Sequence, residues 1–216
     1  MSIFAKAQNS LLAVFLKKIF KIEIVNPENE PDFSSYIVCA NHSSNWDPVI
    51  LGACMHKPLR YMAKSELFKI PILKSLVKWF GAYPVNRNGA DVSSIKTTIN
   101  ILEQGEIVGM YPQGSRAKGV HPKDITPKHG VAMIAVKAKT GILPVTVISK
   151  KYKVRLFSRT IIIFGRYMPY EELIENAGGE NENKISENMN LYKKIADKVY
   201  AEILENYEKY DTVNKK

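Results

Sequence analysis

Cysteine is scarce in this chain, and its scarcity excludes a fold held together by disulfides. Only Cys39 and Cys54 occur among the 216 residues, and each lies in an apolar stretch. Neither has a second Cys or a His at the spacing of a zinc site. We therefore expect both to be free thiols, buried in the core of a protein from a reducing compartment.

Long apolar runs are missing from the N-terminal segment. Residues 11–16 form the longest uninterrupted apolar run in the first twenty residues, whereas a membrane-spanning helix needs about 20. A secretory signal would place charge first, then a longer apolar block and a small-residue cleavage site, and these are absent. Lysines interrupt the apolar residues, so residues 1–24 are expected to form an amphipathic, membrane-associating helix. The alternative is a helix packed on the protein's own core.

Three further absences narrow the chemistry. No group of His, Cys, Asp and Glu has the spacing of a metal site, so neither a metal nor another cofactor is expected. A Gly-x-Ser-x-Gly elbow is missing, which argues against a serine hydrolase. No nucleic-acid-binding module is recognisable either, and nucleic acid is not an expected partner.

Positive charge, by contrast, is in excess. The chain has 31 Lys and Arg against 21 Asp and Glu, which gives a formal net charge of +10. Such an excess indicates anionic partners, such as lipid headgroups, phosphorylated substrates or nucleic acid, without choosing among them. The alternative is an ordinary solvated basic surface.

Strand and helix patterns alternate along the chain. This alternation predicts a single α/β domain, with a mixed, mostly parallel sheet flanked by helices, over residues 25–216. The expected strands are 36–40, 59–63, 82–85, 106–111, 142–149 and 160–165. The expected helices are 48–56, 65–80 with a bend at Pro71, 91–104, 126–141 and 185–210.

His42 and Asp47 follow the first expected strand and carry the clearest chemistry. An imidazole can take a proton from a hydroxyl near neutral pH, and a carboxylate can hold the ring in one tautomer. On a straight helix two residues five apart would point roughly 140° away from each other, so a shared turn suits them better. Asp47 precedes Pro48 and is expected to cap the next helix. An ordinary helix start beside a surface histidine is the alternative.

Two later loops carry groups suited to binding anions. Arg87 ends a short strand, and its planar guanidinium fits phosphate, although a surface arginine is the alternative. Residues 111–116, Tyr-Pro-Gln-Gly-Ser-Arg, follow the strand at 106–111. A glycine-rich turn at a strand end can direct backbone N–H groups at an anion.

Together, four stretches resemble the signatures of the glycerolipid acyltransferases, a family typified by 1-acyl-glycerol-3-phosphate acyltransferase. Residues 41–47 have the form Asn-His-x-x-x-x-Asp, and residues 81–87 have Gly-x₅-Arg. Residues 111–116 are similar to the family's Phe-Pro-Glu-Gly-Thr-Arg. Residues 128–145 contain Lys-x-Gly-x-Ala followed by a strand with a proline. The four stretches occur in family order.

This resemblance implies both a reaction and a site. The expected reaction moves a fatty acyl group from acyl-CoA or acyl carrier protein to the free hydroxyl of lysophosphatidic acid, giving phosphatidic acid for phospholipids. It implies a peripheral or monotopic protein on the anionic, cytoplasmic face of the cell membrane. His42 would be the general base and Asp47 its partner. The implied substrate-binding residues are Asn41, Arg87, Gln113, Gly114, Ser115, Arg116 and Pro144.

Gln113 and Pro144 leave alternatives open. The family usually has Glu where Gln113 stands, so a negative charge is lost. The alternatives are therefore an enzyme whose acceptor is glycerol-3-phosphate or another lysophospholipid, and a weakly active lipid-binding module. Pro144 suits either the substrate site or an edge strand.

Overall fold

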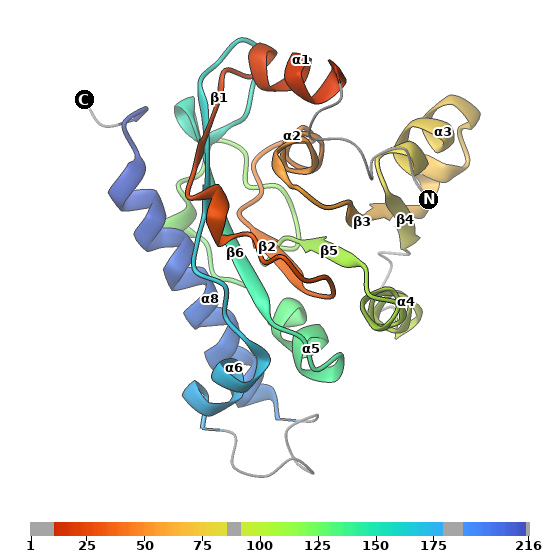
Figure 1. The fold of residues 1–216 in the computed structure, drawn as a ribbon, viewed down its shortest axis with the longest axis vertical. Coiled ribbons are helices and arrows are strands. Elements are labelled where there is room, and N and C mark those ends of the chain that lie inside the picture. Colours follow the sequence, from red (N-terminus) through yellow and green to blue (C-terminus); the bar gives the residue numbers. More distant parts are fainter. Residues whose placement is uncertain (1–10, 86–91, 179–187, 215–216) are drawn as a thin grey trace.

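One sheet organises the molecule, seen in a computed structural model that describes residues 11–85, 92–178 and 188–214 (Figure 1). Within these residues the strand order is β1-β7-β6-β2-β5-β3-β4, and β6 and β7 are the only antiparallel neighbours. The predicted mixed, mostly parallel α/β fold is therefore confirmed. The strands are β1 (Ile22–Val25), β2 (Ile37–Ala40), β3 (Leu59–Lys64), β4 (Ala82–Val85), β5 (Ile107–Met110), β6 (Ile142–Ser149) and β7 (Thr160–Phe164).

Helices cover both faces of the sheet (Figure 1). One face carries α1 (Leu11–Ile19) and α2 (Asp47–Cys54). The opposite face carries α4 (Val92–Glu103), α5 (Gly130–Lys137), α6 (Tyr170–Asn176) and α8 (Met189–Tyr210). A further helix, α3 (Pro71–Trp79), packs beside β4.

β2 explains why the core has two halves. Ile37 and Cys39 point to the face with α5 and α8, whereas Val38 and Ala40 point to the face with α1 and α2. Successive side chains of a strand face opposite sides, and a central parallel strand is buried on both. All four residues are fully buried, and Cys39 and Cys54 are free and buried as predicted.

The parallel neighbours β2 and β5 position the functional loops. Cys39 of β2 lies opposite Met110 of β5. Because the two strands run in the same direction, the loops that begin at Asn41 and Tyr111 leave the sheet at the same edge. Ligand sites of open α/β sheets lie beyond this carboxyl edge of the strands.

Several element predictions need correction. The strand β1 and the helix α6 were not predicted. The boundary expected after residue 24, which lies within β1, stays a prediction. The segment 65–80 does divide near Pro71, into a 3₁₀ turn (Ser65–Phe68) and α3. Asp91, the expected cap of α4, lies outside the described residues.

The helix expected from residue 126 begins later, at Gly130. The backbone before it makes a different contact, since the Lys128 N–H donates to the Pro112 carbonyl at 2.7 Å. α8 begins at Met189, where the Asn188 side chain accepts from two backbone N–H groups. Residues 185–187, the expected start of this helix, lie outside the described residues.

The N-terminal helix α1 packs on the domain with one side only. Ala13 and Leu16 are buried, as is Phe20 just beyond the helix, while Val14 and Phe15 are exposed. Across the described ranges, no helix combines the length and the apolar character needed to cross a bilayer. Residues 1–10 lie outside the described part, so the membrane role of the segment 1–24 stays a prediction.

Candidate active site

His42 and Asp47 meet in the turn between β2 and α2. His42 Nδ1 lies 2.8 Å from Asp47 Oδ2, as expected of a shared turn. The Asp47 side chain is fully buried, whereas the His42 side chain keeps 14% of its surface exposed. The imidazole is therefore held by the buried carboxylate at Nδ1, and part of the ring remains accessible from outside.

The Asp47 carboxylate is fixed by the loop that precedes it. Its Oδ2 accepts the backbone N–H groups of Ser43, at 2.6 Å, and Ser44, at 2.8 Å. The prediction that Asp47 caps α2 is wrong, because the helix begins at Asp47 and Trp46 occupies the cap position. The carboxylate turns back to the loop instead, where charge-assisted hydrogen bonds compensate for its burial.

This geometry assigns the tautomer of His42. Since Nδ1 faces a carboxylate, it carries the proton and donates to Asp47. Nε2 then has a free lone pair. A neutral imidazole in this tautomer can take a proton from a hydroxyl placed beside Nε2.

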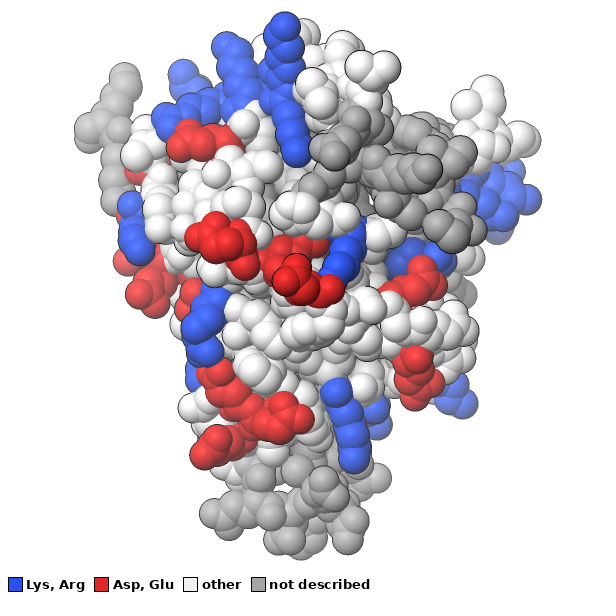
Figure 2. All heavy atoms as spheres, in the orientation of Figure 1, with Lys and Arg blue, Asp and Glu red and all other residues white. Residues whose placement is uncertain are grey.

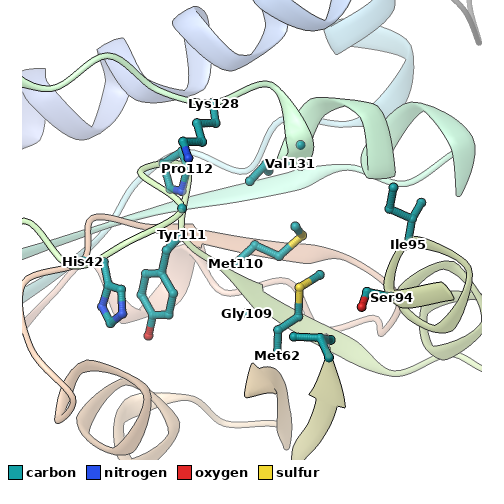
Figure 3. Close-up of a pocket in the computed structure, with 13 residues that line it drawn as sticks. His42, Met62, Ser94, Ile95, Gly109, Met110, Tyr111, Pro112, Lys128 and Val131 are labelled. Carbon is teal, nitrogen blue, oxygen red and sulfur yellow. The ribbon is translucent and has the colours of Figure 1, made fainter. Parts of the chain in front are cut away.

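Tyr111, the residue after β5, stacks on His42 (Figure 3). The ring centroids are 3.9 Å apart and the planes are inclined by 15°. The hydroxyl groups of Tyr111 and Tyr61 are buried without a hydrogen-bond partner among the described atoms. Burial raises the pKa of both hydroxyls well above the usual value, so both stay neutral.

Gln113 binds the backbone of His42. Its Oε1 accepts the His42 N–H, and the His42 carbonyl accepts the Ala117 N–H at 2.9 Å. Both backbone polar groups of His42 are thus held by the loop that follows β5. Gln113 is buried, so its carbonyl oxygen is engaged within the protein, and the substrate contact predicted for it stays a prediction.

Asn41 and Pro144 lie in the protein interior. The Asn41 amide donates to the Val147 carbonyl at 2.9 Å and accepts the Val147 N–H at 2.7 Å, which ties the turn to β6. Pro144 lies in β6 opposite Cys39. The edge-strand alternative for Pro144 is wrong, since β6 lies between β7 and β2. Their predicted contacts with substrate stay predictions.

A cavity of about 410 Å³ opens beside His42. It extends from the imidazole and Tyr111 past Met110 and Met62 to α4 (Figure 3). Its apolar lining comes from five elements, which contribute Met62, Val85, Ile95, Met110 and Val131. The cavity therefore offers an apolar compartment with a histidine at one end.

Lys128 also lines this cavity and was not among the predicted site residues. Its side chain passes over Gly114, where an added Cβ would lie 2.9 Å from Lys128 Cδ and 3.1 Å from Nζ. Gly114 has a φ of +70°, so a side chain there would be strained as well as crowded. Within the described ranges Lys128 has no ion-pair partner. The Lys-x-Gly-x-Ala pattern contained this residue, but sequence alone did not place it beside Gly114.

Gly114 and Arg116, two of the residues expected to bind phosphate, face different hollows. Gly114 lines the cavity with Lys128, whereas Arg116 donates to Asn45 Oδ1 at 2.5 Å and faces a separate hollow. Ser115 is exposed, and Arg87 lies outside the described residues. The separate hollow, of about 360 Å³, is basic, with Arg116, Lys118, Lys153 and Arg155 in its lining.

Comparison with known proteins gives consistent results. A family model described as Acyltransferase matches residues 21–148. The chain is 36% identical over 134 residues to a 1-acyl-sn-glycerol-3-phosphate acyltransferase from Bacillus subtilis, covering 62% of this chain and 65% of that one. It is 40% identical over 114 residues to the Streptococcus pneumoniae protein of the same name, covering 52% and 41%. The aligned part thus spans less than two thirds of either relative.

A solved structure shares the fold. The crystal structure of the 1-acyl-sn-glycerophosphate (LPA) acyltransferase PlsC from Thermotoga maritima matches with a TM-score of 0.66 and 19% identity. The match covers 93% of this chain and 81% of that one. At this identity the likeness concerns the fold alone, and it supports the α/β architecture described above.

Proposed function

Because this chain belongs to the acyltransferase family, we propose that it transfers a fatty acyl group to the free hydroxyl of 1-acyl-sn-glycerol-3-phosphate, giving phosphatidic acid. The observation that carries this proposal is the His42–Asp47 pair at the mouth of the apolar cavity. The donor is a thioester, acyl-CoA or acyl carrier protein. The names of the two bacterial relatives support the acceptor.

The proposed reaction is a single acyl transfer. Nε2 of His42 takes the proton of the acceptor hydroxyl while that oxygen attacks the thioester carbonyl carbon. The C–S bond then breaks, and the leaving thiolate takes the proton back from the imidazolium. Asp47 stabilises the imidazolium through Nδ1. General base catalysis of this kind supplies about 10²–10⁴-fold in rate, and holding both substrates beside Nε2 contributes further.

The cavity lining suggests how the substrates are held. The apolar compartment past Met110 suits an acyl chain. Lys128, over the Gly114 turn, suits the phosphate of the acceptor, because its ammonium is unpaired among the described residues and lies on the cavity that contains His42. Arg87 and Arg116 remain proposed phosphate ligands, and Arg116 would reach the acceptor from the separate basic hollow.

The protein acts in this proposal at the cytoplasmic face of a membrane. The exposed apolar side chains of α1 include Leu11, Val14 and Phe15, and Lys17 and Lys18 follow them in its last turn. The α3 region adds exposed Ile70 and Ile72. Helices with apolar side chains on one side and lysines nearby lie in lipid interfaces.

Kinetics of variants test the proposed roles. His42→Ala should lower kcat by about 10²–10⁴-fold, because the base is lost. Lys128→Met should chiefly raise KM for lysophosphatidic acid. Lys137→Met, on the exposed side of α5, is the matched control and should behave like the parent. Transfer from labelled acyl-CoA in mixed micelles gives both constants, with folding checked by circular dichroism. A folded His42→Ala protein with the parental kcat would contradict the proposal.

A further inference from the structure

The loop that joins β6 to β7, residues 150–159, has an unusual backbone. Lys151, Tyr152 and Phe157 have φ values of 55°, 52° and 62°. Residues other than glycine rarely adopt this left-handed conformation, and bulky ones least of all. Hydrogen bonds hold it: the Phe157 N–H donates to the Ile19 carbonyl at 2.9 Å, and the Tyr152 carbonyl accepts the Gly119 N–H at 3.2 Å.

The constrained loop presents apolar side chains to the outside. Phe157 is 70% exposed and its neighbour Leu156 is 46% exposed. A strained backbone persists only where the surrounding structure maintains it, and such sites often serve function. An aromatic ring held outward in this way offers an apolar contact to a partner.

Basic residues surround these two apolar side chains. Lys150, Lys151 and Arg155 line one hollow of about 330 Å³. Arg155 and Leu156 also line the hollow that contains Lys118 and Lys153. Neither lining contains a carboxylate. In Figure 2, Lys and Arg side chains gather at the upper end of the molecule, where Figure 1 places this loop.

The β6–β7 loop lies beside the end of α1. The bond between Phe157 and the Ile19 carbonyl joins the loop to the end of that helix, and the Thr160 N–H donates to the Lys21 carbonyl at 3.3 Å. Figure 1 shows both segments at the same end of the molecule. The exposed apolar residues of α1 and of the loop thus belong to one surface.

This surface reaches the turn that carries His42. The Val154 N–H donates to Ser43 Oγ at 3.3 Å, and Trp46 lines the same hollow as Arg155. The Trp46 ring also lies 5.3 Å from that of Phe20, next to α1. A lipid surface resting here would be adjacent to the candidate active site.

We propose that the β6–β7 loop is a second membrane contact, in which Leu156 and Phe157 enter the apolar edge of an anionic bilayer. Lys150, Lys151 and Arg155 then bind the lipid headgroups. Aromatic and leucine side chains flanked by lysines are typical of interfacial membrane segments, and clustered cations are attracted to anionic lipid. This inference adds to the α1 contact of the proposed function and does not depend on the acyl transfer.

Vesicle co-sedimentation of the full chain tests this inference, using vesicles of phosphatidylcholine alone or mixed with phosphatidylglycerol. Phe157→Asn removes the ring, and asparagine tolerates a positive φ, so the fold should be retained. We expect weaker binding to both vesicle types. Lys150→Gln and Arg155→Gln should each weaken binding to the anionic vesicles only, by about fivefold per charge.

The matched controls lie in the first turns of α8, which begins at the opposite end of the molecule from the loop (Figure 1). Met189→Asn removes a similarly exposed apolar side chain, and Lys193→Gln removes an exposed charge. Both should bind vesicles like the parent. Parental binding by a folded Phe157→Asn protein would overturn the inference. So would charge variants that keep vesicle binding and lose binding to polyglutamate, a result that would assign the surface to an acidic protein.

Acyl transfer in detergent micelles separates this inference from the proposed function. The loop variants should transfer at the parental rate there, because the chemistry does not need a bilayer. A parent that binds vesicles through the loop but transfers nothing would contradict the proposed function and would support the membrane contact.

Discussion

At the scale of single residues, Gln113 determines how the backbone of His42 is held. Its Oε1 accepts the His42 N–H from within the protein. A glutamate, which the family resemblance leads one to expect at this position, would also offer an oxygen to this N–H. The substitution therefore preserves the contact that the structure contains, and a change of acceptor does not follow from the lost charge alone.

Replacing Gln113 tests this role. Gln113→Glu should keep the preference for lysophosphatidic acid over glycerol-3-phosphate. Gln113→Leu should lower kcat, since an unpaired buried N–H costs about 1–3 kcal/mol and the base would shift. Steady-state kinetics with both acceptors measure the two effects. A Glu variant that prefers glycerol-3-phosphate, or a Leu variant that matches the parent, would refute the assignment.

Two substitutions of Tyr111 distinguish the contribution of ring stacking to stability from that of the hydroxyl group. Tyr111→Phe keeps the ring on His42 and removes a hydroxyl that is buried without a partner among the described atoms. The free energy of unfolding should stay the same or rise by about 1 kcal/mol. Tyr111→Ala removes the ring and should lower it by about 3–5 kcal/mol.

Urea denaturation of the parent and the two Tyr111 variants measures these changes. A Phe variant destabilised as much as the Ala variant would show that the hydroxyl has a partner, such as a bound water.

The sequence predicted the reactive side chains at this scale but not the distant contacts that hold them in place. Imidazole and carboxylate five residues apart predicted the His42–Asp47 contact. The Asn41 amide, however, bonds to Val147, which is 106 residues away. Lys128 covers Gly114 only because the chain returns past Pro112 before α5 begins. Contacts over such separations depend on the topology, which a local pattern does not contain.

At the scale of elements, an ion pair joins the end of β7 to α6. Arg166 donates through both terminal nitrogens to Glu172, at 2.7 Å and 2.6 Å. This bond holds the pKa of the Glu172 carboxyl at about 2, below its usual 4.5. Because the folded pKa is the lower one, the pair stabilises the protein above pH 4.5, and the stabilisation is lost as the pH falls towards 2.

Glu172→Gln should therefore lower the free energy of unfolding at pH 7. The decrease should be no more than about 1 kcal/mol, because Arg166 is exposed and solvent screens the pair. The difference from the parent should shrink between pH 4.5 and 2. Urea unfolding across this range measures it, and a constant difference would mean that Glu172 acts through something other than its charge.

Prediction succeeded for the elements whose burial marks them in the sequence. β2 and β6 are apolar at nearly every position because both of their faces are covered. β1 has only four residues and lies at the edge of the sheet, directly after an amphipathic helix. Its apolar residues therefore could not be distinguished in the sequence from those of the helix. α6 is a seven-residue helix, too short for a helical period to emerge.

At the scale of the whole molecule, part of the net charge of +10 is concentrated in one region of the surface. Part of it surrounds the hollows beside the His42 turn, next to exposed apolar side chains of α1 and the β6–β7 loop. Deleting residues 1–20 would disturb the core as well as this surface, because Ala13, Leu16 and Phe20 are buried. Single substitutions are therefore the cleaner probe of membrane contact.

The most direct test of the account is to identify the product of the purified protein. Acyl-CoA and, separately, acyl carrier protein would be offered with lysophosphatidic acid, monoacylglycerol or lysophosphatidylcholine, and the lipids analysed by mass spectrometry. We predict phosphatidic acid from lysophosphatidic acid with at least one donor, little product from the other acceptors, and none above background with His42→Ala. No phosphatidic acid from either donor, with the protein folded, would contradict the central claim.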